Sequence, residues 1–169
     1  MGRSRGVFLF CLVVGSVCTG ALWADPVLFQ GHYYQLTSSA KTWQGAQAEA
    51  ESVNGNLVWI DSYEEQIFLE RTFLVGPFVF RPVWIGLIDV GSEGDFYWYD
   101  LNNPQSVRFR YFTAGEPNDA IFPGETGEDY VAMNWGFSVG LEEALPGDWN
   151  DTPVGGTPPG YFPPASDGP

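Results

Sequence analysis

The sequence predicts an α+β domain. Two amphipathic helix patterns lie between residues 38 and 75, and short apolar or aromatic strand patterns come before and after them. A long segment with little periodicity, Asp100–Glu128, then separates the later strands. A loop of this length in a compact domain is usually functional or disordered, and its polar residues favour function. At 169 residues the chain predicts one core rather than two.

The first elements are a strand and a helix. Aromatic residues predict a strand at Phe29–Leu36. Ser38-Ser39 offers an N-cap for the helix that follows, and Gly55 offers its stop. The apolar residues of this helix recur at helical spacing: Trp43, Ala46, Ala50 and Val53.

A second helix follows a short strand at Leu57–Ile60. Ser62 and Glu65 form a capping box at its start, and Gly76-Pro77 marks its end. Its apolar side comprises Ile67, Phe68, Leu74 and Val75.

The later strands are more apolar. Val83–Leu87 is a continuous apolar run and predicts a buried strand. Phe96–Tyr99 predicts an aromatic strand and Tyr130–Trp135 a core strand, to which Asp148-Trp149 returns. Of the 18 residues 152–169, six are Pro and four are Gly, which excludes a helix or a central strand there.

The N-terminus, residues 1–24, predicts a secretory signal peptide. Two arginines precede an apolar run, Val7–Val17, and small residues follow it. A membrane anchor is the alternative, but the run falls short of the roughly 20 apolar residues that span a bilayer. We therefore expect a secreted protein, extracellular or periplasmic, with no membrane association after cleavage. Both cysteines, Cys11 and Cys18, lie in this segment, so the mature domain is expected to lack disulfides.

Oxygen donors gather in three short segments of the second half of the chain. The segments are Glu116-Pro117-Asn118-Asp119, Glu128-Asp129 and Trp149-Asn150-Asp151. Calcium takes roughly six to eight oxygen ligands from such side chains. Pro117 can adopt the cis bond of tight turns and direct its two neighbours to one side of the loop. Asn150 and Asp151 are adjacent, so we expect the backbone to leave its strand there. The net charge of −14 makes nucleic acid an unsuitable partner.

These motifs resemble C-type lectin domains. Glu-Pro-Asn followed by Trp-Asn-Asp is the paired signature of that family, and Trp84-Ile85-Gly86-Leu87 resembles its central strand. The resemblance implies a C-type lectin-like fold over residues 29–154, with two helices flanking mostly antiparallel sheets and a long calcium-binding loop. Residues 155–169 would be a Pro/Gly-rich tail with a truncated closing strand at Gly160–Phe162, which leaves an unpaired edge near Tyr33.

The resemblance also implies the ligands. One principal calcium would be held, with a sugar, by Glu116, Asn118, Glu128, Asn150 and Asp151. An auxiliary calcium would be held by Asp89, Glu93, Asp119, Glu128 and Asp129. Glu125 competes with Glu128 for its role, because this loop is longer than the family's compact form. The Glu-Pro-Asn order goes with mannose-type sugars (mannose, glucose, GlcNAc or fucose), and Gln-Pro-Asp with galactose.

The sequence also departs from the family. Where half-cystines are usual it has Ala50, Tyr130 and Val154, which suggests a disulfide-free variant of bacterial type. Asn150-Asp151-Thr152 fits a glycosylation acceptor, but a glycan there would block the ligand, so we interpret it as coincidence.

Three functions compete. The first is calcium-dependent carbohydrate binding, with an oligomer supplying avidity. The second is a protein-interaction or adhesion module that calcium stabilises without sugar binding. A glycosidase using Glu116 and Glu128 has only the presence of acids in its favour. The single histidine, His32, has no nearby partners, and the mature chain has no Ser-His-Asp or Cys-His set, so we expect no enzyme.

Overall fold

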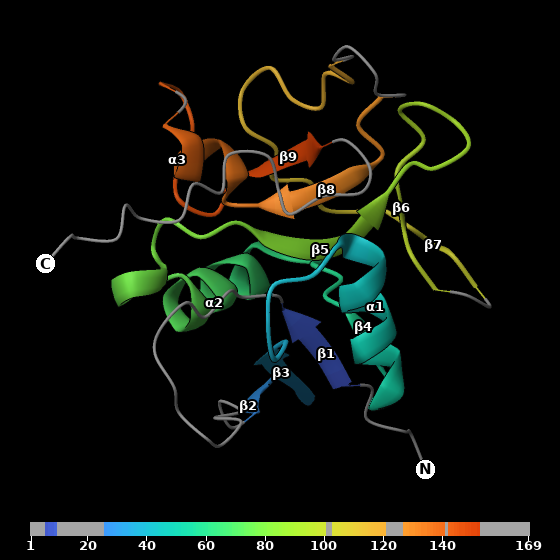
Figure 1. Cartoon of the computed structure of the whole chain (residues 1–169), viewed down its shortest axis with the longest axis vertical. Coiled ribbons are helices and arrows are strands. Elements are labelled where there is room, and N and C mark those ends of the chain that lie inside the picture. Colours follow the sequence, from blue (N-terminus) through green and yellow to red (C-terminus); the bar gives the residue numbers. More distant parts are fainter. Residues whose placement is uncertain (1–5, 10–25, 101–102, 121–126, 141, 153–169) are drawn as a thin grey trace, which may run out of the picture.

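A computed structural model describes residues 6–9, 26–100, 103–120, 127–140 and 142–152 (Figure 1). Its strands are β1 Gly6–Leu9, β2 Val27–Phe29, β3 His32–Leu36, β4 Gly55–Leu57, β5 Val83–Ile88, β6 Tyr97–Trp98, β7 Gln105–Ser106, β8 Tyr130–Met133 and β9 Trp149–Thr152. Its helices are α1 Trp43–Ser52, α2 Tyr63–Phe73 and α3 Trp135–Val139, with a 3-10 turn at Gly76–Phe78.

The strands form two sheets. The smaller has the order β2-β3-β1-β4, and the larger has the order β7-β6-β5-β8-β9 with every pair antiparallel. Figure 1 shows α1 (cyan) at one side of the smaller sheet and α2 (green) at the other. The predicted α+β class, with two main helices and mostly antiparallel sheets, is confirmed; within the smaller sheet β1 pairs parallel with β3 and with β4.

The first helix begins later than predicted. Its N-cap is Thr42, whose Oγ1 accepts from the Gly45 amide at 3.1 Å. Ser38 instead donates from its amide and its hydroxyl to the Glu49 carboxylate, at 2.8 and 3.2 Å. The prediction of a cap at Ser38-Ser39 was wrong because a distant carboxylate engages that serine.

The second helix begins as predicted. The Glu65 amide donates to Ser62 Oγ at 3.2 Å, as in a capping box. The Glu65 side chain does not return to Ser62, since its two oxygens accept from the Asp61 amide and the Tyr34 hydroxyl, at 3.0 and 2.7 Å. The helix ends at Phe73, before Gly76-Pro77.

Three predicted strands have different bounds. A turn at Gln30-Gly31, with φ of 45° and 85°, divides Phe29–Leu36 into β2 and β3. The strand expected at Leu57–Ile60 is Gly55–Leu57. Tyr130–Trp135 ends at Met133, because Asn134 adopts a left-handed conformation and starts α3.

The edge of β3 near Tyr33 is not unpaired. Tyr33 pairs with Leu28 of β2 on one side and with Gly6 of β1 on the other. This edge is therefore paired in the described chain, and the expectation of an open edge in the mature domain stays a prediction. β1 lies within the predicted signal peptide, whose cleavage would remove it. The predicted closing strand, Gly160–Phe162, lies outside the described residues.

The central strand β5 organises the core. All six of its residues are buried, as the apolar run predicts. Gly86 lies against the Leu57 carbonyl and the Trp59 indole, and a Cβ at this position would sit 2.9 Å from each. The absent side chain therefore lets the segment after β4 pack directly on β5.

Replacing Gly86 with alanine should reduce the free energy of unfolding by about 1–3 kcal/mol, because the neighbouring backbone oxygen cannot move away cheaply. Chemical denaturation measures this change. Gly45→Ala in α1 is the control: its Cβ would meet Lys41 and Thr42 side-chain atoms at 3.3 Å, and helix propensity favours alanine. Equal stability of Gly86→Ala and the wild type would contradict the packing described here.

Candidate metal centre

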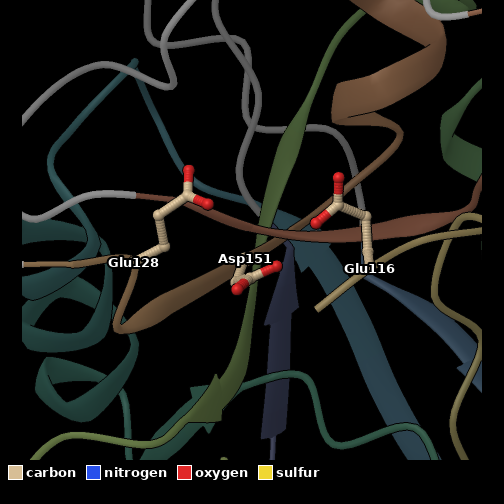
Figure 2. Close-up of side chains that lie close together, drawn as sticks. All are labelled: Glu116, Glu128 and Asp151. Carbon is tan, nitrogen blue, oxygen red and sulfur yellow. The ribbon is translucent and has the colours of Figure 1, made fainter. Parts of the chain in front are cut away.

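Three carboxylates from distant parts of the chain meet beside the larger sheet. Glu116 lies in the loop before β8, Glu128 lies two residues before β8, and Asp151 lies within β9. One oxygen of each lies within 4.8 Å of one oxygen of the others. Figure 2 shows Glu116 and Glu128 facing each other on either side of Asp151. Like charges repel at this spacing, so the arrangement calls for a compensating positive charge.

Backbone pairing brings these residues together. β8 and β9 are antiparallel neighbours, with Val131 opposite Asp151. The loop joins β9 through Phe112, which forms a parallel bridge with Trp149, and through the Thr113 amide, which donates to the Trp149 carbonyl at 2.9 Å. The sheet therefore fixes the start of the loop next to the ligands of β9.

Backbone amides hold the rest of the loop. The amides of Asn118 and Asp119 donate to the buried Asp151 carboxylate at 3.1 and 3.0 Å. The Ala120 amide donates to Glu128 Oε2 at 2.8 Å, and the Glu128 amide donates to Asp119 Oδ1 at 3.0 Å. The Glu116-Pro117 bond is cis, as the sequence suggested. These bonds give the loop one shape around the carboxylates.

Two buried oxygens beside this group have no hydrogen-bond partner among the described residues. They are Glu116 Oε2 and Asn150 Oδ1. A buried oxygen without a partner is costly, and a cation bound by the three carboxylates would satisfy Glu116 Oε2. All the candidate ligand atoms here are carboxylate and amide oxygens. Such oxygens suit a hard cation such as calcium and not a metal that prefers thiolate ligands. The residues present therefore fit the ion that the sequence predicts.

The electrostatics agree with a cation site. Burial, then the neighbouring carboxyl of Asp151 and the charge of Glu128, together raise the pKa of Glu116 from its ordinary 4.5 to about 7. Without a cation, these groups resist ionisation. A bound divalent ion would reverse this, because it favours the charged carboxylates.

The residues expected to hold a second ion lie nearby. Asp89 is 1% exposed; its Oδ2 accepts from the Gly94 amide at 2.9 Å, and its Oδ1 has no partner among the described residues. Desolvation, then the charges of Asp89 and Asp119, raise the pKa of Glu93 to about 7. Burial and Asp119 raise the pKa of Asp129. Within the described ranges, however, only Glu116, Glu128 and Asp151 meet the 4.8 Å spacing.

Asn150 and Asp151 do not leave their strand. Both lie within β9, opposite Ala132 and Val131, so the expectation of a departure was wrong. Adjacent strand residues direct their Cβ atoms to opposite faces, but the Asn150 side chain turns back toward Asp151. The Asn150 amide donates to the Asp151 carbonyl at 2.7 Å, which fixes the asparagine beside its neighbour. Asn150 is 2% exposed, so the N-glycosylation motif that begins at this residue is inaccessible in the folded domain. Glu125 lies outside the described residues.

Gln66 of α2 supports the site from a distance and was missed by the sequence analysis. This side chain is fully buried; its Oε1 accepts from the Trp149 indole at 2.9 Å and its Nε2 donates to the Gly147 carbonyl at 2.9 Å. It therefore fixes the segment that leads into Asn150. In the sequence a helical glutamine gives no signal of this contact, 83 residues away.

Comparisons with known proteins agree with this fold. The family model for the lectin C-type domain matches residues 39–151. The human protein "C-type lectin domain family 4 member K" is 40% identical over 95 residues, which are 54% of this chain and 27% of that protein. The chain spans between 23% and 49% of the length of the curated relatives it matches.

Solved structures are also similar. The cow carbohydrate-recognition domain of CD23, solved in the presence of GlcNAc2Man3 oligosaccharide, is 36% identical with a TM-score of 0.50, covering 67% of this chain and 70% of that one. The human scavenger receptor C-type lectin domain has a TM-score of 0.61 at 23% identity, covering 82% of this chain and 91% of that one, and shows the fold alone.

The α+β fold, with an acidic loop site beside an antiparallel sheet, is that of a C-type lectin domain. The chain belongs to the C-type lectin domain family, as its motifs predicted. The family is one of binding domains, so the prediction that the chain is not an enzyme is confirmed. No helix in the described ranges has the length and apolar character needed to cross a bilayer.

The metal-stripped protein should lose stability as the pH rises. The pKa values of Glu116 and Glu93 are raised from 4.5 in the unfolded chain to about 7 in the folded domain. The protonated carboxyls therefore contribute fully to the free energy of unfolding below pH 4.5, and this contribution is lost as the pH rises through 7. Scanning calorimetry after calcium removal should show a lower melting temperature at pH 8 than at pH 5. Glu116→Gln should reduce the difference, and a flat or rising profile for the wild type would contradict this assignment.

Gln66→Met should weaken calcium binding about tenfold, as the loss of a supporting contact behind a metal ligand typically does. Gln47→Met is the matched control. Gln47 is also a buried helical glutamine, but it lies in α1 and accepts from the Leu57 amide. Both changes should reduce stability by about 1–3 kcal/mol. Titration calorimetry with calcium separates them, and equal affinities in the two variants would show that Gln66 is only structural.

Proposed function

We propose that this chain is a calcium-dependent lectin domain that binds mannose-type sugars through two neighbouring hydroxyls. Glu116, Asn118, Glu128, Asn150 and Asp151 would hold the ion, and the same residues would contact the sugar. Membership of the family and the oxygen donors around Glu116 support this proposal.

The observation that carries the proposal is the pairing of Glu116 with Asn118. The Asn118 side-chain amide donates to Glu116 Oε1 at 3.0 Å, so a donor and an acceptor lie side by side. Asn118 is exposed, whereas Glu128 and Asp151 are buried behind it. A purely structural ion site has no need of such a pair on its solvent side.

These side chains suit a hydroxyl pair. A sugar hydroxyl is both donor and acceptor, so it can donate to the Glu116 carboxylate and accept from the Asn118 amide. The bound calcium would supply a doubly charged centre with positions left for sugar oxygens. Charge-assisted hydrogen bonds from a fixed carboxylate are directional, and they select the geometry of the hydroxyls.

An auxiliary calcium site is part of the proposal. Asp89, Glu93, Asp119 and Asp129 interact electrostatically, and Asp119 also binds the Glu128 amide. An ion there would order the loop that carries Glu116. We also propose that the domain is secreted, as its N-terminus suggests, and that oligomers give single weak sites their avidity.

A protein-interaction module that uses calcium only to order its loops is the second candidate. Phe80 is 63% exposed and its ring stacks on Phe137 at 5.4 Å. An aromatic pair with one exposed ring suits a protein contact.

Affinity chromatography separates the two candidates. The full chain should be retained on immobilised mannose in calcium, pass through immobilised galactose, and elute with chelator. Calcium that raises the melting temperature without retention on either resin would favour the interaction module. Retention on mannose in chelator would overturn the metal-dependent mechanism.

The double change Glu116→Gln with Asn118→Asp should reverse the sugar preference, because it exchanges which residue carries the charge. We expect mannose binding to fall about tenfold or more, the effect of losing a charge-assisted hydrogen bond. Competitive elution with mannose and galactose measures the ratio. Asn150→Ala is the control that should abolish both, and an unchanged ratio in the double variant would count against the role of the pair.

A further inference from the structure

A cavity of about 320 Å³ lies away from the metal centre, beside β6 and β7. These strands form one edge of the larger sheet, and β9 forms the opposite edge (Figure 1). The lining residues are Trp59, Asp61, Trp98, Gln105, Ser106 and Arg108. None of them belongs to the proposed calcium or sugar ligands, so the cavity is a separate feature.

The two indoles of this cavity are fixed in place. The Trp59 indole donates to the Tyr99 carbonyl at 3.1 Å and packs against the backbone at Gly86. Trp98 is 1% exposed and meets Trp149 edge to face, with ring centroids 5.7 Å apart. The half-buried Trp59 ring is therefore preorganised to contact a ligand and the buried Trp98 is held rigid, which lowers the cost of binding.

The polar residues around the indoles carry both signs of charge. Asp61 and Arg108 are exposed, and in the described part of the chain no carboxylate oxygen lies within 4 Å of the Arg108 guanidinium. Its donors are thus available to a ligand. Gln105 is half-buried, and its Nε2 donates to the Asn103 carbonyl at 2.8 Å, which holds the amide in position.

This combination selects a class of ligand. Asp61 would repel an anion, and Arg108 would repel a cation. A neutral polyhydroxyl ring can instead donate to the carboxylate and accept from the guanidinium. The C–H faces of such a ring can pack on an indole. Pockets of roughly 300 Å³ or more with aromatic walls and a few placed polar groups are typical of small-molecule sites. We propose that this cavity is a second, metal-independent site for a neutral pyranose.

The test uses the full chain carrying Asn150→Ala, in chelator, so that the proposed calcium site is silent. Methyl β-glucopyranoside is the probe, since its equatorial substituents leave both ring faces open. Heteronuclear NMR with assigned indole N–H and side-chain amide signals follows the titration. The proposal expects saturable shifts, with a millimolar dissociation constant, at Trp59, Trp98 and Gln105.

The double change Asp61→Asn with Arg108→Gln alters exposed side chains only and should leave the rest of the spectrum unchanged while removing these shifts. Absence of shifts in the parent chain would overturn the proposal. Equal shifts at all indoles, or shifts that persist in the double variant, would also overturn it. The proposal does not depend on the proposed function: mannose resin can fail while this titration succeeds, and the reverse.

Discussion

The buried carboxylate of Asp151 is the contact on which the site depends. It lies inside a strand, without solvent, and accepts the backbone amides of Asn118 and Asp119 from the facing loop. Buried carboxylate oxygens need hydrogen-bond donors, and the loop supplies them by closing over this residue. Closure places Glu116 opposite Glu128 and brings Asn118 to the surface. One strand residue thereby shapes a loop more than thirty residues away.

The aromatic core gives this arrangement a rigid base. Ala50 of the first helix is fully buried, and Tyr130 packs against Trp43, with ring centroids 5.1 Å apart. Trp43 also meets Tyr99 edge to face and donates from its indole to the Ile85 carbonyl at 2.8 Å. The first helix is therefore joined to the central strand by packing and a buried hydrogen bond.

Local chemistry in the sequence predicted much of the fold. The Ser62–Glu65 box and the apolar run of β5 are signals that act over a few residues, and both elements form where expected. The cap at Thr42 and the end of β8 at Asn134 were not predictable in this way. Glu49 engages Ser38 from the far side of a helix, and Asn134 binds the carbonyls of Val79 and Arg81. Such contacts between distant residues leave no periodic trace.

The candidate site divides in the same manner. Glu116, Asn118 and Asp151 stand out as donors because their motifs are compact, whereas Gln66 acts through a tryptophan 83 residues away and resembles an ordinary helical side chain. The sequence does not decide between Glu128 and Glu125 as the ligand, because only the folded chain determines which carboxylate lies near the others. The sequence thus predicts ligand residues well where they lie close together in the chain. It does not predict the residues of a distant helix that hold those ligands in place.

Trp149 has a further consequence. Its indole is surrounded edge-on by Trp98, Phe109 and Phe112, each with ring centroids 5.7 Å away, and it is one residue from Asn150. Because the fluorescence of an indole depends on its surroundings, a movement of β9 would change the emission of Trp149. A calcium titration of the proposed site could therefore be followed without a dye or tag.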